Sequence, residues 1–160
     1  MLIINVSVDK ISEATYPGLA AWIKDLNSIR DVPVKVTLAV EDDIARGVMV
    51  WEPGNLIYMV VQKDSRRGGV AKYMLRYLLT QSERKHVQCR VHPSNVAAIC
   101  FFHQNGFQID RWFIANDNQR YFRMTNHTLV PSHAPSEEID LTTFVDNVPI
   151  FLSMAEGKVI

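Results

Sequence analysis

The sequence lacks net charge, has few cysteines and contains no long apolar run. Its 17 basic and 17 acidic side chains balance, so no overall field favours nucleic acid or an anionic membrane. Cys89 and Cys100 cannot form a disulfide framework, and their apolar neighbours favour free thiols in a reducing compartment. No apolar stretch approaches the roughly 18 residues of a membrane span. The N-terminus "MLIINVSVDK" lacks the positive region of a signal peptide, so we expect a cytoplasmic protein with no membrane partner.

Two further kinds of site find little support. The five histidines and two cysteines show no metal-ligand spacing, so no metal cofactor is expected. Aromatic residues and arginines are interleaved in "RWFIANDNQRYF", which could form a nucleic-acid face. On two alternating strands, the simpler interpretation is a buried aromatic row backed by solvated arginines. We therefore expect no nucleic-acid partner.

Hydrophobic periodicity predicts seven strands and three helices in one domain. Pro17 fits the first turn of a helix in "TYPGLAAWIKDLNSIR", and Ser94 is the expected N-cap of a short helix that ends at Gly106. A type II turn is expected at Pro53-Gly54. The predicted order is β-α-βββ-α-β-α-ββ. The strands are expected at 2–8, 32–40, 45–51, 56–61, 86–91, "FQIDRWFIA" and "QRYFRMT", and the central helix at 69–83.

The composition changes after residue 126. Residues 127–160 hold three of the seven prolines, a possible helix from Ser136 and an apolar stretch over 145–154. We therefore divide the chain into a domain at 1–126 and a C-terminal extension at 127–160. The extension is expected to pack on the domain or to mediate assembly, including a homo-oligomer.

The segment "DSRRGGVAKYMLRYLL" places arginines and glycines directly before the central helix. It could be a plain connector. A nucleotide P-loop is excluded, because Val70 and Ala71 stand where its Lys and Ser/Thr would be. A dinucleotide fold is excluded because G-x-G-x-x-G is absent. The pattern [R/Q]-x-x-G-x-[G/A] is met by Arg66, Gly69 and Ala71; it lets main-chain N–H groups and a helix N-terminus bind a pyrophosphate.

A second segment, "CRVHPSNVAAICFFHQNGF", follows at the right distance. Together the two segments resemble the motifs of the GNAT (GCN5-related) N-acetyltransferase superfamily, and the resemblance covers roughly residues 1–125. It implies an α/β (α+β) fold, with a central, mixed but mostly antiparallel sheet of six to seven strands flanked by helices. The second motif is carried by Asn95, Ala98, Phe102, Gly106 and Phe107.

The resemblance implies an acetyl-CoA site between two strands that separate near Val61 and Val91. The pantetheine arm would pair with the main chain from Met59 through Val60 to Val61, and Asn95 would contact it. The remaining implied cofactor residues are Phe102 and the loop residues Arg66, Arg67, Gly68, Gly69, Val70, Ala71 and Lys72, of which Arg67 and Lys72 would meet the 3′-phosphate.

The acid–base groups that the resemblance implies are replaced. Phe102 stands where many members carry a proton-donating tyrosine, and Arg90 stands where some carry a glutamate base. The candidate substitutes are Tyr58, His92 and Glu52. Each has a structural alternative: His92 as a surface or cap residue, Tyr58 as a core aromatic and Glu52 as a hairpin-turn residue.

Two functions follow from the resemblance. The first is an acetyl-CoA-dependent N-acetyltransferase that moves an acetyl group to a primary amine, of a small molecule or a protein, by direct attack in a ternary complex. The second is a GNAT-fold protein with little or no catalysis, used for binding or as a structural component of an assembly. The second draws support from Phe102, Arg90 and the extension.

Overall fold

The computed structural model describes residues 1–127. The expected helix from Ser136 and the packing or assembly role of residues 128–160 lie outside the described residues. Within them, the predicted element order is confirmed. The elements are β1 (Leu2–Val6), α1 (Leu19–Ser28), β2 (Lys35–Glu41), β3 (Ile44–Glu52), β4 (Asn55–Val61), α2 (Val70–Thr80), β5 (Gln88–Val91), α3 (Val96–Gln104), β6 (Gln108–Ile114) and β7 (Arg120–Thr125), with short 3-10 turns at Val8–Lys10, Lys63–Ser65 and Glu83–Lys85.

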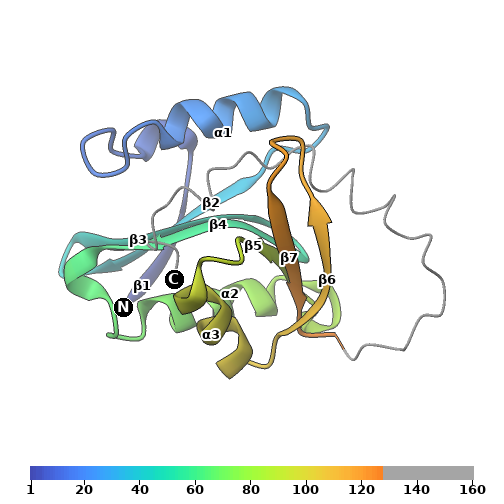
Figure 1. Cartoon of the computed structure of the whole chain (residues 1–160). Helices are drawn as coiled ribbons and strands as arrows, with labels where there is room; N and C mark the ends of the chain where they lie inside the picture. Colours follow the sequence, from blue (N-terminus) through green and yellow to red (C-terminus); the bar gives the residue numbers. More distant parts are fainter. Residues whose placement is uncertain (128–160) are drawn as a thin grey trace.

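The seven strands form one sheet in the order β1-β2-β3-β4-β5-β7-β6 (Figure 1). Every pairing is antiparallel except the one between β4 and β5. The mixed, mostly antiparallel sheet expected from the resemblance is therefore confirmed. The parallel step arises because β4 and β5 are joined through α2, a crossover that places both strands in the same direction.

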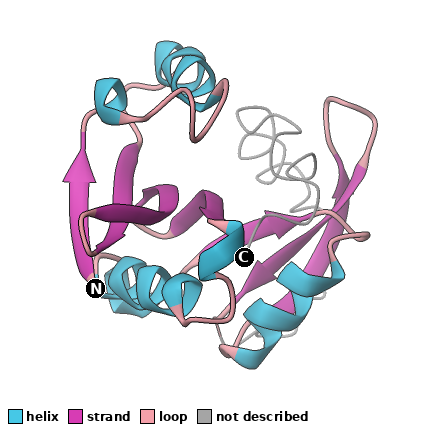
Figure 2. Cartoon of the chain, turned by 90° about the vertical axis from the view of Figure 1, so that its left-hand side faces the viewer, coloured by secondary structure: helices cyan, strands magenta, loops and turns pink. Residues whose placement is uncertain are grey.

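The sheet separates two helical layers (Figure 2). One face packs against α1 through a buried cluster that includes Leu19, Ile23 and Val50. The other face packs against α2 and α3 through a second cluster that includes Met74 and Phe102. Apolar residues at i, i+4, i+5 and i+8 give α2 its buried side, which is formed by Val70, Met74, Leu75 and Leu78.

Two tight turns and two register shifts, one at Ala39/Val40 in the β2–β3 pair and one at Val50/Trp51 in the β3–β4 pair, set the register of the central strands. Asp42 and Asp43 take φ values of 53° and 61°, the left-handed pair that a two-residue hairpin requires. Gly54 has φ 85°, in agreement with the expected type II turn. The register of β3 and β4 then shifts between Val50 and Trp51, so Ile57 is an extra residue in β4.

Three local expectations differ from the structure. Pro17 precedes α1 rather than occupying its first turn, because Gly18 in the left-handed region (φ 75°) is the N-cap. Asn95, not Ser94, caps α3: its Oδ1 accepts from the N–H of Ala98 at 3.2 Å. The central helix ends at Thr80, and residues 83–85 form a separate 3-10 turn.

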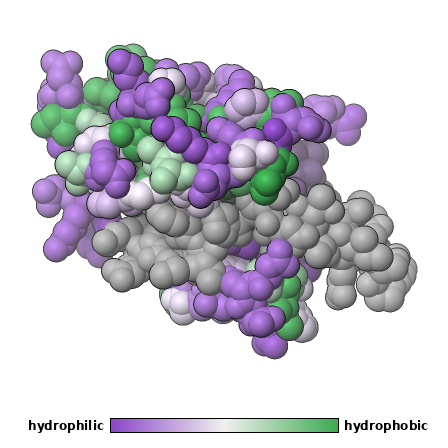
Figure 3. Space-filling model, turned by 90° about the horizontal axis from the view of Figure 1, so that it is seen from above, coloured by the Kyte–Doolittle hydropathy of each residue, from purple (hydrophilic) through white to green (hydrophobic). Residues whose placement is uncertain are grey.

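The surface on the α1 side mixes hydrophilic and hydrophobic residues where the chain is described (Figure 3). Exposed apolar side chains such as Ile29 and Val32 lie beside α1, whereas Trp112 and Ile114 lie on the edge strand β6. Across residues 1–127, no helix combines the length and apolar character that a bilayer crossing demands.

Gly47 lies where β3 is in close contact with side chains of α2. A Cβ atom at this position would lie 2.8 Å from Met74 Cε, 3.1 Å from the carbonyl oxygen of Val60 and 3.2 Å from Val70 Cγ1. We predict that Gly47→Ala lowers the free energy of unfolding by about 1–3 kcal/mol, because the side chains of Met74 and Val70 and the main chain at Val60 must shift to make room. Urea denaturation would measure the change. Ala21→Ser, which adds one heavy atom at an exposed position of α1, is the control; an equal effect of both would contradict the close contact.

Candidate active site

The strands β4 and β5 separate after a very short pairing. Only Asn55 with Gln88 and Leu56 with Cys89 are in register, although β4 continues to Val61 and β5 to Val91. The separation expected near Val61 and Val91 is therefore present. It leaves the second half of β4 with a strand on one side only.

The main chain of β4 offers hydrogen-bonding groups toward this gap. The N–H of Gln62 donates to the carbonyl of Arg46 at 2.8 Å. Together with the register of β3 and β4, this hydrogen bond shows which main-chain groups of β4 point toward β3 and which point away from it. In an antiparallel pair, successive residues point alternately toward and away from the partner strand. Val60 therefore faces β3, whereas the N–H and C=O groups of Met59 and Val61 face the gap. A ligand that lies along β4 would meet Met59 and Val61, not the main chain of Val60.

The loop after β4 turns its main-chain N–H groups outward. Gly69 takes φ 82° and is the N-cap of α2, and Arg67 takes φ 66°. Within residues 1–127, no acceptor meets the N–H groups of Arg67, Gly69, Val70, Ala71 and Lys72. An anion at the start of an eleven-residue helix would satisfy these donors and the positive end of the helix dipole.

The space in front of the loop is open. A Cβ atom placed on Gly69 would meet no atom within 4 Å, so the space directly beside this residue is open. Arg66 Nε donates to the carbonyl of Val61 at 3.3 Å and so fixes the loop to the end of β4. Arg67 and Lys72 are exposed at its rim, and Gly68 lies between the two left-handed residues. These features fit a diphosphate with further negative charge beside it.

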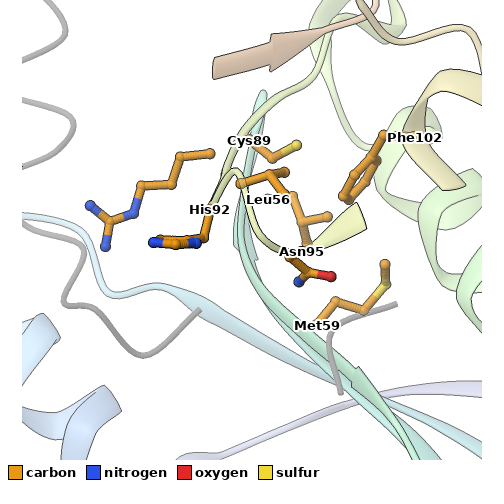
Figure 4. Close-up of a pocket in the computed structure, with 8 residues that line it drawn as sticks. Leu56, Met59, Cys89, His92, Asn95 and Phe102 are labelled. Carbon is orange, nitrogen blue, oxygen red and sulfur yellow. The ribbon is translucent and has the colours of Figure 1, made fainter. Parts of the chain in front are cut away.

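A pocket lies at the point where β4 and β5 diverge (Figure 4). It joins residues of β4 to residues of β5, α3 and the segment between them, which α2 separates from β4 in the sequence. Figure 4 shows Met59 and Asn95 side by side, with Phe102 and His92 on opposite sides of Leu56. The full lining is Leu56, Met59, Cys89, Arg90, Val91, His92, Asn95 and Phe102.

Phe102 gives the pocket an apolar wall with no exchangeable proton. It is 1% exposed and packs on Phe107 at 5.3 Å between ring centroids. Asn95 is 9% exposed, and its carbonyl oxygen is engaged by the start of α3. Both residues line the pocket, and the Asn95 side chain also serves as a helix cap.

His92 is the predicted acid–base residue that reaches the pocket. Its Nδ1 accepts from the N–H of Ser94 at 3.1 Å and lies 2.6 Å from the Ser94 hydroxyl oxygen. The neutral ring then carries its proton on Nε2. The ring edge also packs on Tyr121, with centroids 5.6 Å apart.

The other two predicted catalytic residues lie elsewhere. Glu52 accepts from Arg30 Nη1 at 2.6 Å and from Asn55 Nδ2 at 3.1 Å, so its carboxylate is held at the hairpin end of β4. Tyr58 is 6% exposed and packs edge-to-face on Trp22 on the α1 side of the sheet. Burial, together with the neighbouring Tyr16, raises the pKa of Tyr58 to about 12. Neither residue lines the pocket.

Arg90 is the pocket residue whose surroundings the sequence did not predict. It is 2% exposed, and its guanidinium carbon lies 4.3 Å from the centroid of the Tyr121 ring. Burial lowers the pKa of Arg90 to about 10, although Tyr121 and Asp117 oppose the shift. The sequence predicted that the arginines of the last hairpin lie on the opposite face from a buried row of aromatic residues. This prediction is wrong, because Tyr121 and Arg123 are two residues apart on β7 and therefore point to the same face of the sheet.

The sequence also matches a known family. Residues 34–109, which contain β2 to α3, match the model of the acetyltransferase (GNAT) domain. This central part of the chain is therefore similar to the GNAT acetyltransferase domain. No curated protein matches the sequence.

Solved GNAT structures resemble the chain in fold. A GNAT-family acetyltransferase from Bacillus cereus ATCC 10987 aligns with a TM-score of 0.61 at 18% identity, over 81% of this chain and 98% of that one. A family member from Elizabethkingia anophelis, solved with acetyl-CoA bound, gives 0.58 at 12% identity over 79% and 97%. Naa50 from Arabidopsis thaliana, solved with the bisubstrate analogue CoA-Ac-MVNAL, gives 0.52 at 14% identity over 79% and 99%. Sequence identities this low support a shared fold but give no information about the substrate.

The two thiols provide a chemical test of the pocket. Burial raises the pKa of Cys89, whereas Cys100 is exposed on α3. Because the thiolate is the reactive form, we predict that one thiol reacts rapidly with a disulfide reagent in the folded protein and that two react after denaturation. Cys100→Ser should abolish the rapid phase. Two rapid thiols in the native protein would mean that the pocket is open down to Cys89.

Proposed function

We propose that this protein is an N-acetyltransferase that uses acetyl-CoA and acetylates a primary amine by direct attack in a ternary complex. The observation that carries the proposal is the set of main-chain N–H groups of Arg67, Gly69, Val70, Ala71 and Lys72, placed beside the gap between β4 and β5. The pyrophosphate would accept from these groups, and Arg67 and Lys72 would meet the 3′-phosphate. The acetyl-CoA and CoA–peptide complexes of the fold neighbours support the same cosubstrate.

The main chain of β4 would orient the acyl group. The pantetheine arm would hydrogen-bond to Met59 and Val61 like an added strand, and the N–H of Met59 would donate to the oxyanion that forms at the thioester carbon. The amine nitrogen bonds to this carbon, the carbon–sulfur bond breaks, and the amine loses a proton while CoA leaves as the thiol. Phe102 cannot supply the thiol proton, so His92 or solvent would transfer it.

A binding role without catalysis is the second candidate. It is favoured by one observation, the apolar wall of Phe102 at the position of a proton donor. Release of free thiol from acetyl-CoA over a panel of amines separates the two functions, since only an enzyme releases it faster than the uncatalysed reaction without protein. Residues 127–160 would serve as a packing or assembly element in either case, and the cytoplasmic location stays a prediction.

Gly69 tests the cosubstrate site, and Gly18 offers a matched control. Both residues are helix N-caps with positive φ and with no atom near an added Cβ, at 82° and 75° respectively. We predict that Gly69→Glu weakens CoA binding by at least about 2 kcal/mol, because it places a carboxylate at the anion site. This loss corresponds to roughly 30-fold in Kd.

Calorimetry with CoA measures this change, and Gly18→Glu should leave Kd unaltered. If wild-type protein binds no CoA, or if both variants bind it equally well, the assigned site is wrong.

Phe102 tests the chemistry. We predict that Phe102→Tyr raises kcat for thiol release at least about tenfold, because a phenol can protonate the leaving thiolate and general acid help typically contributes 10²–10⁴-fold. The Kd for CoA should change little. Phe101→Tyr, one residue earlier on α3 and outside the pocket lining, is the control. An unchanged kcat in Phe102→Tyr with intact CoA binding would show that thiolate protonation does not limit the rate.

A further inference from the structure

The outer strand of the last hairpin carries exposed apolar side chains on one face. Ile109, Trp112 and Ile114 of β6 are 43%, 54% and 61% exposed, and we call these three residues the β6 stripe. Ile109 is in register with Met124, which belongs to the core under α2 and α3, and Trp112 is in register with Phe122, two residues before Met124. Directly opposed residues of antiparallel strands project from the same face. The β6 stripe therefore lies on the side of the sheet that packs against α2 and α3.

The β6 stripe is not covered by the helices of its own side. Figure 1 shows α3 beside the base of the β6–β7 hairpin, whereas the tip that follows Ile114 extends beyond this helix. β6 is also the last strand in the sheet order, so no strand of residues 1–127 pairs with its outer edge. Exposed apolar residues along an unpaired edge strand are typical of a surface that binds another segment of chain.

Positive charge accompanies the β6 stripe. Arg120 of β7 is exposed, and its guanidinium carbon lies 4.5 Å from the centroid of the Trp112 ring. Arg120 is in register with Ile114, so the charge lies at the tip of the hairpin on the same face. A segment that fits this surface would therefore combine apolar side chains with negative charge.

The formal charges of the chain are divided between its two parts. Residues 1–126 contain 16 Lys and Arg against 12 Asp and Glu, a surplus of four positive charges. Residues 127–160 contain one Lys against five Asp and Glu, a surplus of four negative charges. The domain and the C-terminal extension therefore attract each other, whereas two copies of the domain repel each other.

The extension also contains the apolar side chains that the β6 stripe requires. Its apolar stretch over 145–154 reads "VDNVPIFLSM". Acidic residues lie before, within and after this stretch: Glu137, Glu138, Asp140, Asp146 and Glu156. The stretch thus combines the two properties of a partner for the stripe and Arg120.

The extension starts close enough to reach the β6 stripe. The Asn126 side chain accepts from the N–H of Val87 at 2.8 Å and donates to the carbonyl of Lys85 at 2.7 Å, which fixes the point where the extension begins. This point follows Thr125, the register partner of the first residue of β6. The seven residues of β6 extend over about 20 Å, whereas residues 128–144 can span up to about 55 Å.

We infer that residues 145–154 bind to the β6 stripe of their own domain, with apolar side chains on Ile109, Trp112 and Ile114 and with the acidic residues toward Arg120. The inference goes beyond the proposed function and does not depend on it, because no residue of the stripe lines the pocket between β4 and β5. Binding of CoA or release of thiol, measured separately, decides the proposed function alone.

Paramagnetic relaxation enhancement in the full-length ¹⁵N-labelled protein tests the contact. A nitroxide is attached to the thiol of Ser153→Cys in a Cys100→Ser background, where Cys89 is buried. We expect the amide signals of the β6 stripe to lose most of their intensity. The signals of Ile29 and Val32, which are exposed apolar residues beside α1, should keep theirs.

A mixed sample identifies which copy supplies the extension. Protein that carries the nitroxide but no ¹⁵N is mixed with ¹⁵N-labelled protein that carries no nitroxide. Binding within one chain predicts no loss of signal in this mixture. Loss of the stripe signals in the mixture would assign the contact to a second copy and overturn the inference, as would a loss confined to another surface or no loss at all in the first sample.

Trp112→Ala assigns the contact to the β6 stripe. We predict that this change raises the rate of proteolytic cleavage within the extension at least about tenfold, because a bound segment is cleaved only while it is released and buried tryptophans dominate such contacts. Val32→Ala is the matched control, since Val32 is 72% exposed and lies outside the stripe. It should leave the rate unaltered. Equal cleavage rates in Trp112→Ala and in the wild type would contradict the inference.

Discussion

The site depends on a parallel pairing between β4 and β5 that is only two residue pairs long. Beyond Leu56 and Cys89 the two strands diverge. The extra residue Ile57 also changes which residues of β4 direct their N–H and C=O groups toward β3. As a consequence, Met59 presents main-chain groups to the gap rather than to a neighbouring strand. A sheet that stayed paired to Val61 would satisfy these groups internally and would leave no room for a ligand between the strands.

The same divergence separates two kinds of surface. On the side of α2 and α3, the loop before α2 supplies main-chain donors and the pocket wall is apolar at Phe102. On the side of α1, the pocket wall contains the polar residues Arg90 and His92, both packed on the ring of Tyr121.

Much of this arrangement could be predicted from the sequence because it is encoded locally. The element order follows from periodicity and from turn residues such as Gly54, and the left-handed turn that begins α2 follows from Gly69 before an amphipathic helix. What could not be predicted depends on tertiary contacts. Glu52 looks like a free carboxylate in the sequence, but Arg30, which follows α1, neutralises it. The choice between Met59 and Val60 depends on the ladder with β3, and no local pattern reveals that register.

The packing of the last hairpin against β5 also could not be predicted from the sequence. The alternation of "RWFIANDNQRYF" predicts two faces but not which residues of the neighbouring strand join them, and β5 is 29 residues away from β7 in sequence. Only the pairing of Val91 with Phe122 places Arg90 against Tyr121. The N-cap of α3 was likewise misplaced by one residue, because Ser94 and Asn95 are both good caps and the choice depends on how the chain leaves β5.

Amide chemical shifts during a CoA titration of the ¹⁵N-labelled protein test the central claim most directly. A diphosphate held by main-chain donors should move the amide signals of Gly69, Val70, Ala71 and Lys72 most, together with that of Met59, whose N–H faces the gap. The signal of Val60, whose N–H is engaged by β3, should move far less. If the largest changes fall outside the loop and β4, or if CoA leaves the loop signals in place, the diphosphate does not bind where we have assigned it.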